Sequence, residues 1–455
     1  MRGHTNGGTQ SQMRNAKLPL NELVKATGIL REKVLEWEKK GLTYSEKVSS
    51  GKVFDVNRIL NLKEKLENPN PSYKYTVLSS KPTDYTVIEL FSGAGGLALG
   101  LSNAGFQTKL LVEFDKDAAE TLKTNRPEWN VIPGDIKDVD FTPYRNKIDV
   151  VAGGFPCQSF SYAGNGKGFG DMRGTLFSEF ARCLNEVQPK VALAENVRGL
   201  LTHDNGRTLG TMLHAMDKLG YNVSFRLLRA QFYDVAQKRE RLIIFGVKKG
   251  LEIPFIFPKA NDYIITLGEA LEGCPSSEGA TYPERKAFIM SQVPEGGNWR
   301  DLPIRLQKEY MKGSFHLGGG KTGMARRLSM SEPSLTLVCT PAQAQTERCH
   351  PTETRPITIR ESARIQSFPD DWSFVGSVAS KYKQIGNAVP VNLAFHVGRC
   401  LIAMLSGKFK PETMVIQKAA EKQLDWVFQE SNSFFIKEME WINSIKPQEA
   451  ESCRP

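Results

Sequence analysis

A cysteine and a glutamate each follow a short apolar segment, and together they could supply a nucleophile and an acid. Cys157 lies in the loop GGFPCQ after the apolar segment IDVVA, and Glu195 directly follows VALA. Pro156 fixes its own φ and stiffens the turn that presents the thiol. A single cysteine is usually a small buried hydrophobe, but a Gly/Pro loop at a strand end favours a functional thiol. Adjacent parallel strands lie about 4.8 Å apart, so neighbouring strands would bring thiol and carboxyl into one cleft.

This pair of groups suits methylation of a pyrimidine ring at carbon. Cytosine C5 is too weak a nucleophile to take a methyl group unaided. If a thiolate adds at C6 while an acid hydrogen-bonds to N3, C5 becomes an enamine-like carbon that can attack a methylsulfonium. A free thiol has a pKa of about 8.5 and is mostly protonated at neutral pH. The site must therefore also supply positive potential or a coupled proton transfer.

A glycine-rich loop upstream, FSGAGGL at 91–97, indicates a nucleoside cofactor. It follows the buried segment TVIEL, at the strand-to-helix turn where doubly wound sheets bind ligands, and its glycines allow close approach of the backbone. Glu113 ends the second strand, where an acid commonly binds a ribose diol. Asp135 follows the third strand, where it can accept from an adenine amino group. Each feature alone has a structural explanation, a tight turn or a solvated charge, but three strand ends in register predict the cofactor site.

The elements that must position these residues alternate between strand and helix. Over 85–254 this alternation predicts an α/β fold with a doubly wound, mostly parallel, Rossmann-like sheet. Residues 255–350 are rich in Gly, Pro and polar residues, which is typical of a functional insertion. Helical patterns return over 351–406, in ITIRESARIQSF and NLAFHVGRCLIAML, and 407–455 form a helical tail.

The N-terminal region is predicted to hold a small α-helical, DNA-binding-like domain. Residues 1–17 are predicted as a disordered arm, 18–68 as helix, turn, helix, hairpin and helix, and 69–84 as a Pro/Asn-rich linker. Asp55 is expected to cap the last of these helices. The pattern resembles the winged helix-turn-helix of MerR- or excisionase-type DNA binders. A helical dimerisation or packing module is the alternative.

Composition favours an intracellular protein with a polyanionic partner. The 455 residues carry a formal charge of +10 and a pI of about 9.1, which weakly favours nucleic acid. The 7 cysteines are scattered, without a CxxC pair; this argues against a disulfide framework and a structural zinc site. We therefore expect no metal and a reducing, cytoplasmic location. The polar start lacks a signal-peptide core, and no uninterrupted apolar run approaches the ~20 residues of a membrane helix.

A series of motifs occurs in an order that resembles the DNA (cytosine-5) methyltransferase family of bacterial restriction-modification systems or solitary enzymes. They are FSGAGGL, GGFPCQSFS, RGTLFSEF, ENVRGL, QKRERLIIFGV, RESARIQSFPDDW and QIGNAVPV. The resemblance implies S-adenosylmethionine as the methyl donor, double-stranded DNA as the substrate, and flipping of the target base. The sequence does not depart from the family pattern at the catalytic positions.

The same resemblance assigns roles residue by residue. Cys157 would be the nucleophile, and Glu195 would contact N3 and the exocyclic amine. Two arginines would help hold the base, Arg239 and Arg241, with Arg241 on its O2. The cofactor site would be lined by Phe91, Gly93, Gly95, Glu113, Phe114, Asp135, Ile136, Asn387 and Ala388. Contacts to DNA would come from Gln158, Ser161, Gln237, Arg326 and Arg327.

In this family the segment between the QKRER-type and RESARIQ-type motifs is the variable target-recognition domain. At 255–350, its loops would read base edges in the major groove and stabilise a duplex from which the cytosine has been extruded. An exposed arginine pair such as 326–327 can contact DNA, although such pairs are often only solvated. A cognate restriction endonuclease acting separately, and a monomer on the methylation site, are the further expectations for partners.

Two alternatives are open from the sequence. An RNA cytosine-5 methyltransferase could use the same scaffold, but RNA-directed homologues typically carry Cys-Phe-Thr where this chain has Cys157-Gln158-Ser159. The protein could instead act chiefly as a transcriptional regulator through residues 18–68. Binding to its own promoter would then be either its main role or an added one.

Overall fold

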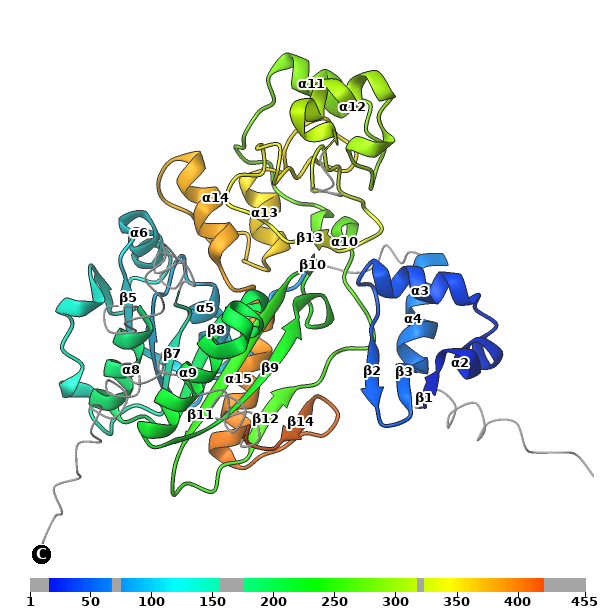
Figure 1. The fold of residues 1–455 in the computed structure, drawn as a ribbon. Coiled ribbons are helices and arrows are strands. Elements are labelled where there is room, and N and C mark those ends of the chain that lie inside the picture. The colour runs from blue at the N-terminus through cyan, green and yellow to red at the C-terminus, as the bar shows by residue number, and fades with distance from the viewer. Residues whose placement is uncertain (1–15, 68–74, 156–175, 317–322, 421–455) are drawn as a thin grey trace, which may run out of the picture. The chain divides into compact units, whose positions relative to one another are not determined.

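The computed structural model describes residues 16–67, 75–155, 176–316 and 323–420 (Figure 1). They form two compact units, each built from segments distant in sequence. The first, here called the sheet unit, comprises Val77–Arg229, Glu240–Lys259 and Asp371–Pro455. The second, here called the loop-rich unit, comprises Met1–Thr76, Ala230–Arg239 and Ala260–Asp370. We describe each unit by itself.

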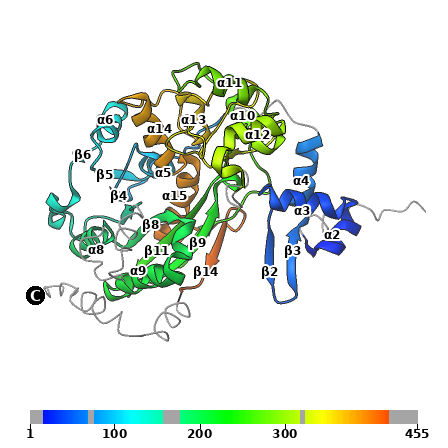
Figure 2. The same cartoon turned by 45° about the horizontal axis from the view of Figure 1, so that its top comes forward.

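A seven-stranded, mostly parallel sheet forms the centre of the sheet unit, as predicted. Its order is β6-β5-β4-β7-β8-β11-β9, and Figure 2 labels these strands apart from β7. Strands β4 to β8 run parallel, whereas β11 is antiparallel to both β8 and β9. The bounds are Thr86–Leu90 (β4), Gln107–Glu113 (β5), Val131–Pro133 (β6), Val150–Gly153 (β7), Val191–Val197 (β8), Tyr221–Arg229 (β9) and Glu240–Lys248 (β11). The chain leaves β4 toward β6 on one side and toward β8 on the other, so the switch point where such sheets bind ligands lies at the carboxyl end of β4.

Helices join the strands of the sheet unit. They are Gly96–Ala104 (α5), Lys116–Asn125 (α6), Leu176–Val187 (α8), Arg207–Lys218 (α9), Val378–Asn387 (α14) and Val391–Ser406 (α15). Helices α5 and α15 approach closely because small residues line their contact: a Cβ on Gly100 would lie 2.3 Å from that of Ala394. A further antiparallel pair joins Phe255–Pro258 (β12) to Met414–Gln417 (β14), so the tail contributes a strand that the sequence did not predict. The predicted tail helix falls mostly outside the described residues.

Helices α14 and α15 together also satisfy the length and hydropathy of a membrane span. Residues 378–406 pass this test, but 78% of their most apolar window is buried inside the structure. The two helices are separated near Pro390, which precedes the first residue of α15. A buried core helix passes the same test, so the finding is weak evidence for a membrane segment.

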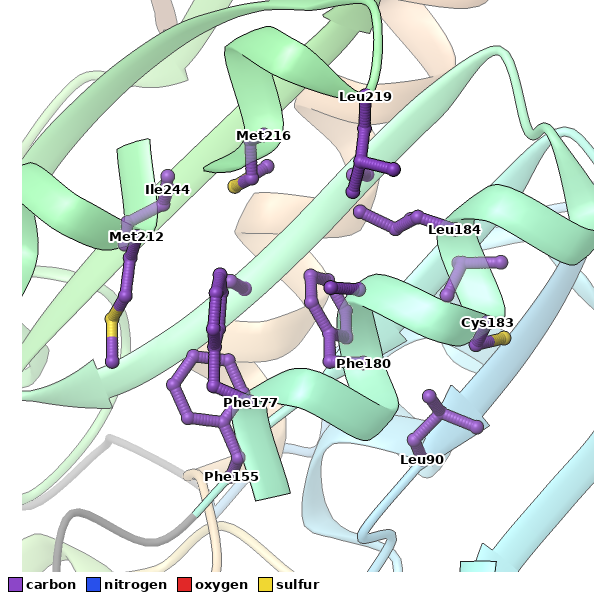
Figure 3. Packing of buried hydrophobic residues seen from close by; sticks show 14 of the residues in the cluster. Leu90, Phe155, Phe177, Phe180, Cys183, Leu184, Met212, Met216, Leu219 and Ile244 are labelled. Atoms are coloured by element: carbon purple, nitrogen blue, oxygen red, sulfur yellow. The ribbon is translucent and has the colours of Figure 1, made fainter. Parts of the chain in front are cut away.

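An aromatic cluster packs α8 against the sheet. Phe177 and Phe180 of α8 contact Phe155, with ring centroids 5.3 Å and 5.7 Å apart (Figure 3). All three side chains are buried, and Cys183 on the same helix is fully buried beside them. Burying a side chain of this size contributes on the order of 1.5–3 kcal/mol. Phe155, two residues after the end of β7, is therefore held firmly beside the carboxyl end of that strand.

The loop-rich unit contains the predicted helices and hairpin of the N-terminal region, preceded by strand β1, which the sequence did not predict. They are Lys17–Pro19 (β1), Leu20–Thr27 (α2), Arg31–Lys39 (α3), Ser45–Val48 (β2), Gly51–Asp55 (β3) and Val56–Glu67 (α4). Gly28 ends α2 in the left-handed region, with φ of 67°. The Asp55 carboxylate accepts a hydrogen bond from the Arg58 amide (3.0 Å) at the start of α4, as expected of a cap.

The rest of the loop-rich unit has short elements around a small core. They are Gln237–Lys238 (β10), Leu267–Leu271 (α10), Glu284–Ser291 (α11), Ile304–Met311 (α12), Ser334–Leu335 (β13) and Ile359–Ile365 (α13). Strand β10 pairs with β13 in parallel. Met290, Trp299, Leu306 and Cys349 belong to the core beneath α11 and α12.

Candidate active site

The loop after β4 is held in an unusual backbone conformation by an acid from the next strand. Phe91, Gly93 and Gly95 have φ angles of 60°, 53° and 90°, and a positive φ is strained for a residue such as Phe91. The Glu113 carboxylate, at the end of β5, accepts from the amide N–H of Gly93 (2.7 Å) and of Asp115 (2.8 Å). Burial raises the pKa of Glu113, although these two N–H groups act in the opposite direction. Glu113 therefore shapes the glycine loop as well as presenting an acid there.

Side chains suited to a nucleoside lie at the neighbouring strand ends. The Phe114 side chain is 75% exposed directly after β5, which is unusual for a large aromatic group. Asp135 follows β6, where one carboxylate oxygen accepts from the Lys137 amide (3.0 Å), and Ile136 is buried beside it. An exposed ring, two acids and a glycine loop at adjacent strand ends suit an adenine and a ribose, so these residues fit the predicted cofactor.

Ala388 reaches the same strand end from the far part of the sequence. It follows α14, and its Cβ would lie 3.1 Å from a Cβ built on Gly96, the first residue of α5. The Val389 carbonyl oxygen is closer still, 2.2 Å from the same point. The predicted cofactor residues Asn387 and Ala388 are thus held at the start of α5, beside the glycine loop, because Gly96 has no side chain.

The carboxyl end of β8 brings Glu195 beside the loop that leads to Cys157. Register pairs Gly153 with Ala194, so Gly154 and Glu195 follow side by side. A Cβ on Gly154 would lie 2.9 Å from Glu195 Oε2. The Asn196 side-chain amide donates to the Phe155 carbonyl (2.9 Å), which ties this loop to β8. Cys157, and with it the predicted DNA contacts Gln158 and Ser161, lie outside the described residues.

Arg241 and Glu195 form a buried ion pair on one face of the sheet. Arg241 Nε lies 2.6 Å from Glu195 Oε1, and both side chains are 10% exposed. Arg241 pairs with Val197 across β11 and β8, two residues beyond Glu195, so both side chains project from the same face. The guanidinium therefore fixes the orientation of the Glu195 carboxyl group. The structure thus brings together two of the predicted base-holding residues.

Gln237, a predicted DNA contact, forms a buried bridge within the loop-rich unit. Its amide nitrogen donates to Gln366 (2.9 Å), and its amide oxygen accepts from the Leu337 N–H (2.9 Å). The side chain is fully buried, and its amide joins β10 to two other segments of the same unit. Arg239 is also buried here, and its Nη1 lies 3.4 Å from the Leu337 carbonyl oxygen.

The expectation of an exposed arginine pair is wrong for Arg327. Its side chain is only 5% exposed. The guanidinium donates to the Thr354 hydroxyl and to the carbonyl oxygens of Met290, Val293, His350, Pro351 and Glu353. Arg327 therefore joins separate loops of its unit and has no donors left for DNA. Arg326, by contrast, is only partly buried.

Glu89 is a site residue that the sequence analysis missed. It lies on β4 with 2% of its surface exposed, and its Oε2 has no hydrogen-bond partner among the described residues. Glu89, Glu113 and Glu195 project from the same face of the sheet, since each faces away from the cluster around α8. Burial raises the pKa of Glu89 well above its usual range, and the charges of Glu113 and Glu195 raise it further. The available signal was one charged residue in the otherwise apolar strand TVIEL.

Comparison with known proteins identifies the class to which this fold and site belong. The profile of the family described as C-5 cytosine-specific DNA methylase matches residues 85–403. The Type II methyltransferase M.Eco47II of Escherichia coli is 53% identical over 410 residues, covering 86% of this chain and 97% of that protein. M.PspPI of a Psychrobacter strain is 59% identical over 332 residues, or 71% of this chain and 80% of that protein.

Solved structures agree with this result. A putative DNA modification methyltransferase encoded within an E. coli prophage has 27% identity and a TM-score of 0.53, and covers 71% of this chain and all of its own. DNMT2 of Spodoptera frugiperda, at 18% identity and a TM-score of 0.50, shares the fold over 70% of this chain. The chain belongs to the C-5 cytosine-specific DNA methylases. It is a type II DNA (cytosine-5-)-methyltransferase that uses S-adenosylmethionine, which confirms the prediction of DNA over RNA.

Proposed function

We propose that methylation by this enzyme proceeds through a covalent bond between Cys157 and C6 of a cytosine flipped out of the duplex. The Sγ–C6 bond forms as the thiolate adds to the ring, and electron density moves to C5. C5 would then attack the methyl group that S-adenosylmethionine supplies on its sulfonium, and the S–CH3 bond would break to leave S-adenosylhomocysteine. Loss of the C5 proton to a base and cleavage of the Sγ–C6 bond regenerate the thiolate and release 5-methylcytosine.

Glu195 and Arg241 would hold the ring during this addition. Glu195 would hydrogen-bond to N3 and the exocyclic amine, which favours addition at C6, and Arg241 would hold O2. The observation that carries this proposal is the Arg241–Glu195 pair beside Gly154, on a loop anchored two residues before Cys157. Arg239 would also help to hold the base.

A Glu195→Gln variant tests the role of the acid. We expect methylation to fall by about 10²–10⁴-fold, the usual contribution of a general acid or base, while S-adenosylmethionine binds as before. Glu120→Gln, at an exposed position of α6, is the matched control and should keep full activity. Normal turnover by Glu195→Gln would contradict the proposal.

The predicted division of the chain follows from this role. Residues 85–254 and 351–406 would form the catalytic domain, and 255–350 would recognise the target sequence in the major groove. Mapping 5-methylcytosine in the genome of expressing cells would identify that sequence. Exchange of 255–350 for the same segment of a relative should exchange the methylated sequence, whereas an unchanged sequence would place recognition elsewhere. We propose that the enzyme acts as a monomer in the cytoplasm, with any cognate endonuclease acting separately.

We also propose that residues 18–68 form a winged helix-turn-helix that binds promoter DNA. The order of α2, α3, the β2–β3 hairpin and α4 supports this proposal. Binding upstream of its own gene would make the enzyme an autoregulator. A gel-shift assay of the full chain on that upstream region, with excess unrelated duplex as competitor, should show a sequence-preferring complex. Loss of the complex under competition would contradict regulation.

A further inference from the structure

Cationic side chains from three separate segments meet around one carboxylate in the loop-rich unit. Glu332 Oε2 lies 2.6 Å from Lys238 Nζ, and Oε1 lies 3.3 Å from Lys40 Nζ. Lys40 follows α3, Lys238 belongs to β10, and Glu332 precedes β13, the partner strand of β10. The charge of Arg326 interacts with those of Lys238 and Glu332. We call these four residues the Glu332 cluster.

Positive charge exceeds negative charge in the Glu332 cluster. The four residues carry three positive charges and one negative charge; Glu36, which contacts Lys40 (3.0 Å) and is more than half exposed, and Asp301, whose charge acts on Arg326, compensate in part. Burial lowers the pKa of Lys238, and the charges of Arg326 and Lys40 lower it further, whereas Glu332 raises it. A partly buried cation near other cations is costly unless an anion lies nearby. The cluster would therefore gain from a further anion.

The Arg326 guanidinium is incompletely paired within the described part of the protein. Its Nε is buried and has no hydrogen-bond partner among the described residues. Burial lowers the pKa of Arg326, although Glu332 and Asp301 act in the opposite direction. Arg348, whose guanidinium donates to the carbonyls of Thr336 and Glu347, adds positive charge beside Arg326. A phosphate oxygen is the acceptor that arginine and lysine donors commonly bind.

The position of Lys40 relative to β10 is fixed by contacts at the end of α3. The Gln231 side-chain amide donates to the Gly41 carbonyl (3.0 Å). The Arg58 guanidinium carbon lies 4.1 Å from the centroid of the Tyr44 ring and 5.4 Å from that of Phe232. These contacts pack the N-terminal segment onto 230–232, five residues before β10, so Lys40 is not on a freely moving arm.

We propose that Lys40, Lys238 and Arg326 bind a backbone phosphate of the duplex that is being methylated. The N-terminal segment would then contact the methylation substrate itself, beyond any promoter that it binds. Glu332 holds the two lysine side chains in place and leaves an excess of positive charge for the phosphate. The proposal rests on duplex DNA being the substrate, and it adds a sequence-independent contact that fixes the position of the enzyme on the DNA.

Full-length Lys40→Ala and Arg326→Ala test this proposal, with Lys39→Ala as the matched control. Lys39 is the exposed last residue of α3 and differs from Lys40 by one position. The probe is a short fluorescent duplex with the mapped methylation site, titrated over a series of NaCl concentrations with S-adenosylhomocysteine present. Loss of one phosphate contact should weaken binding about tenfold and reduce the slope of log Kd against log salt by about 0.9.

The control should keep both the affinity and the salt slope of the wild type. Binding of S-adenosylhomocysteine and the melting temperature show whether each variant is folded, and Arg326→Lys should restore part of the affinity. Equal effects of Lys40→Ala and Lys39→Ala, or an unchanged salt slope in Lys40→Ala and Arg326→Ala, would overturn the proposal. Methylation of the same duplex by the wild type is measured alongside, so failure of this contact is distinguishable from failure of the enzyme's function.

Discussion

The contact between Gly96 and Val389 leads to a quantitative prediction for cofactor binding. A Cβ added at Gly96 would lie 2.2 Å from the Val389 carbonyl oxygen and 3.1 Å from the Ala388 Cβ. Comfortable contact requires roughly 3.5 Å, so in Gly96→Ala the backbone at 388–389 must move by more than about 1 Å. Overpacking of this kind costs about 1–3 kcal/mol, or about 3–9 °C in melting temperature for a unit of this size.

The same displacement would move Asn387 and Ala388 away from the glycine loop. We therefore expect Gly96→Ala to weaken S-adenosylmethionine binding by about tenfold or more, measured by calorimetry on the folded protein. Gly313→Ala is the control, because a Cβ there meets nothing within 4 Å, and it should bind as the wild type does. A Gly96→Ala protein with unchanged affinity and melting temperature would refute the view that close approach of α5 and 388–389 forms the cofactor site.

Two further substitutions test the buried charges. Because the raised pKa of Glu89 keeps its proton on to higher pH in the folded protein, its contribution to stability is greatest below its usual value of 4.5 and is lost as pH rises through the folded pKa. The Glu89→Gln side chain cannot ionise, so the melting temperature of this variant should increase relative to that of the wild type as pH rises from 4.5 through the folded pKa. If the two plots of melting temperature against pH stay parallel, a protonated Glu89 is contradicted. Arg327→Ala removes six hydrogen bonds and leaves buried carbonyls unpaired; it should cost at least about 4 kcal/mol of stability in its unit. Hydrogen exchange should show this loss around 290–293 and 350–354 with S-adenosylmethionine binding intact, and wild-type protection there would contradict the role of Arg327.

The sheet and its strand ends could be predicted because their signals are local. Apolar runs such as TVIEL and IDVVA, each followed by a glycine turn, mark buried parallel strands and the loops at their carboxyl ends. That is enough to place Glu113, Asp135 and Glu195 at one edge. The antiparallel direction of β11 could not be predicted in this way, since a buried apolar strand has the same pattern in either direction.

The roles of single polar residues depend on partners far away in sequence. Gln and Arg are residue types that often contact DNA. The partners of Gln237 and Arg327 are nevertheless backbone groups more than twenty residues away, and both side chains are buried. Glu89, by contrast, is a site residue that the sequence analysis missed, because no neighbour in the sequence explains a charged residue inside an apolar strand. The Arg241–Glu195 pair likewise forms across two strands, β8 and β11, whose pairing the sequence did not specify.

Trapping with 5-fluorocytosine tests the central claim of a Cys157–C6 adduct most directly. In a duplex with this base at the target position, C5 carries fluorine instead of the proton that must leave, so the covalent complex should persist after methyl transfer. We predict a stable protein–DNA complex for the wild type in the presence of S-adenosylmethionine, with the DNA mapped by mass spectrometry to Cys157. Cys157→Ser should bind the duplex and form no such complex. A complex formed by Cys157→Ser, or none formed by an otherwise active wild type, would contradict the mechanism.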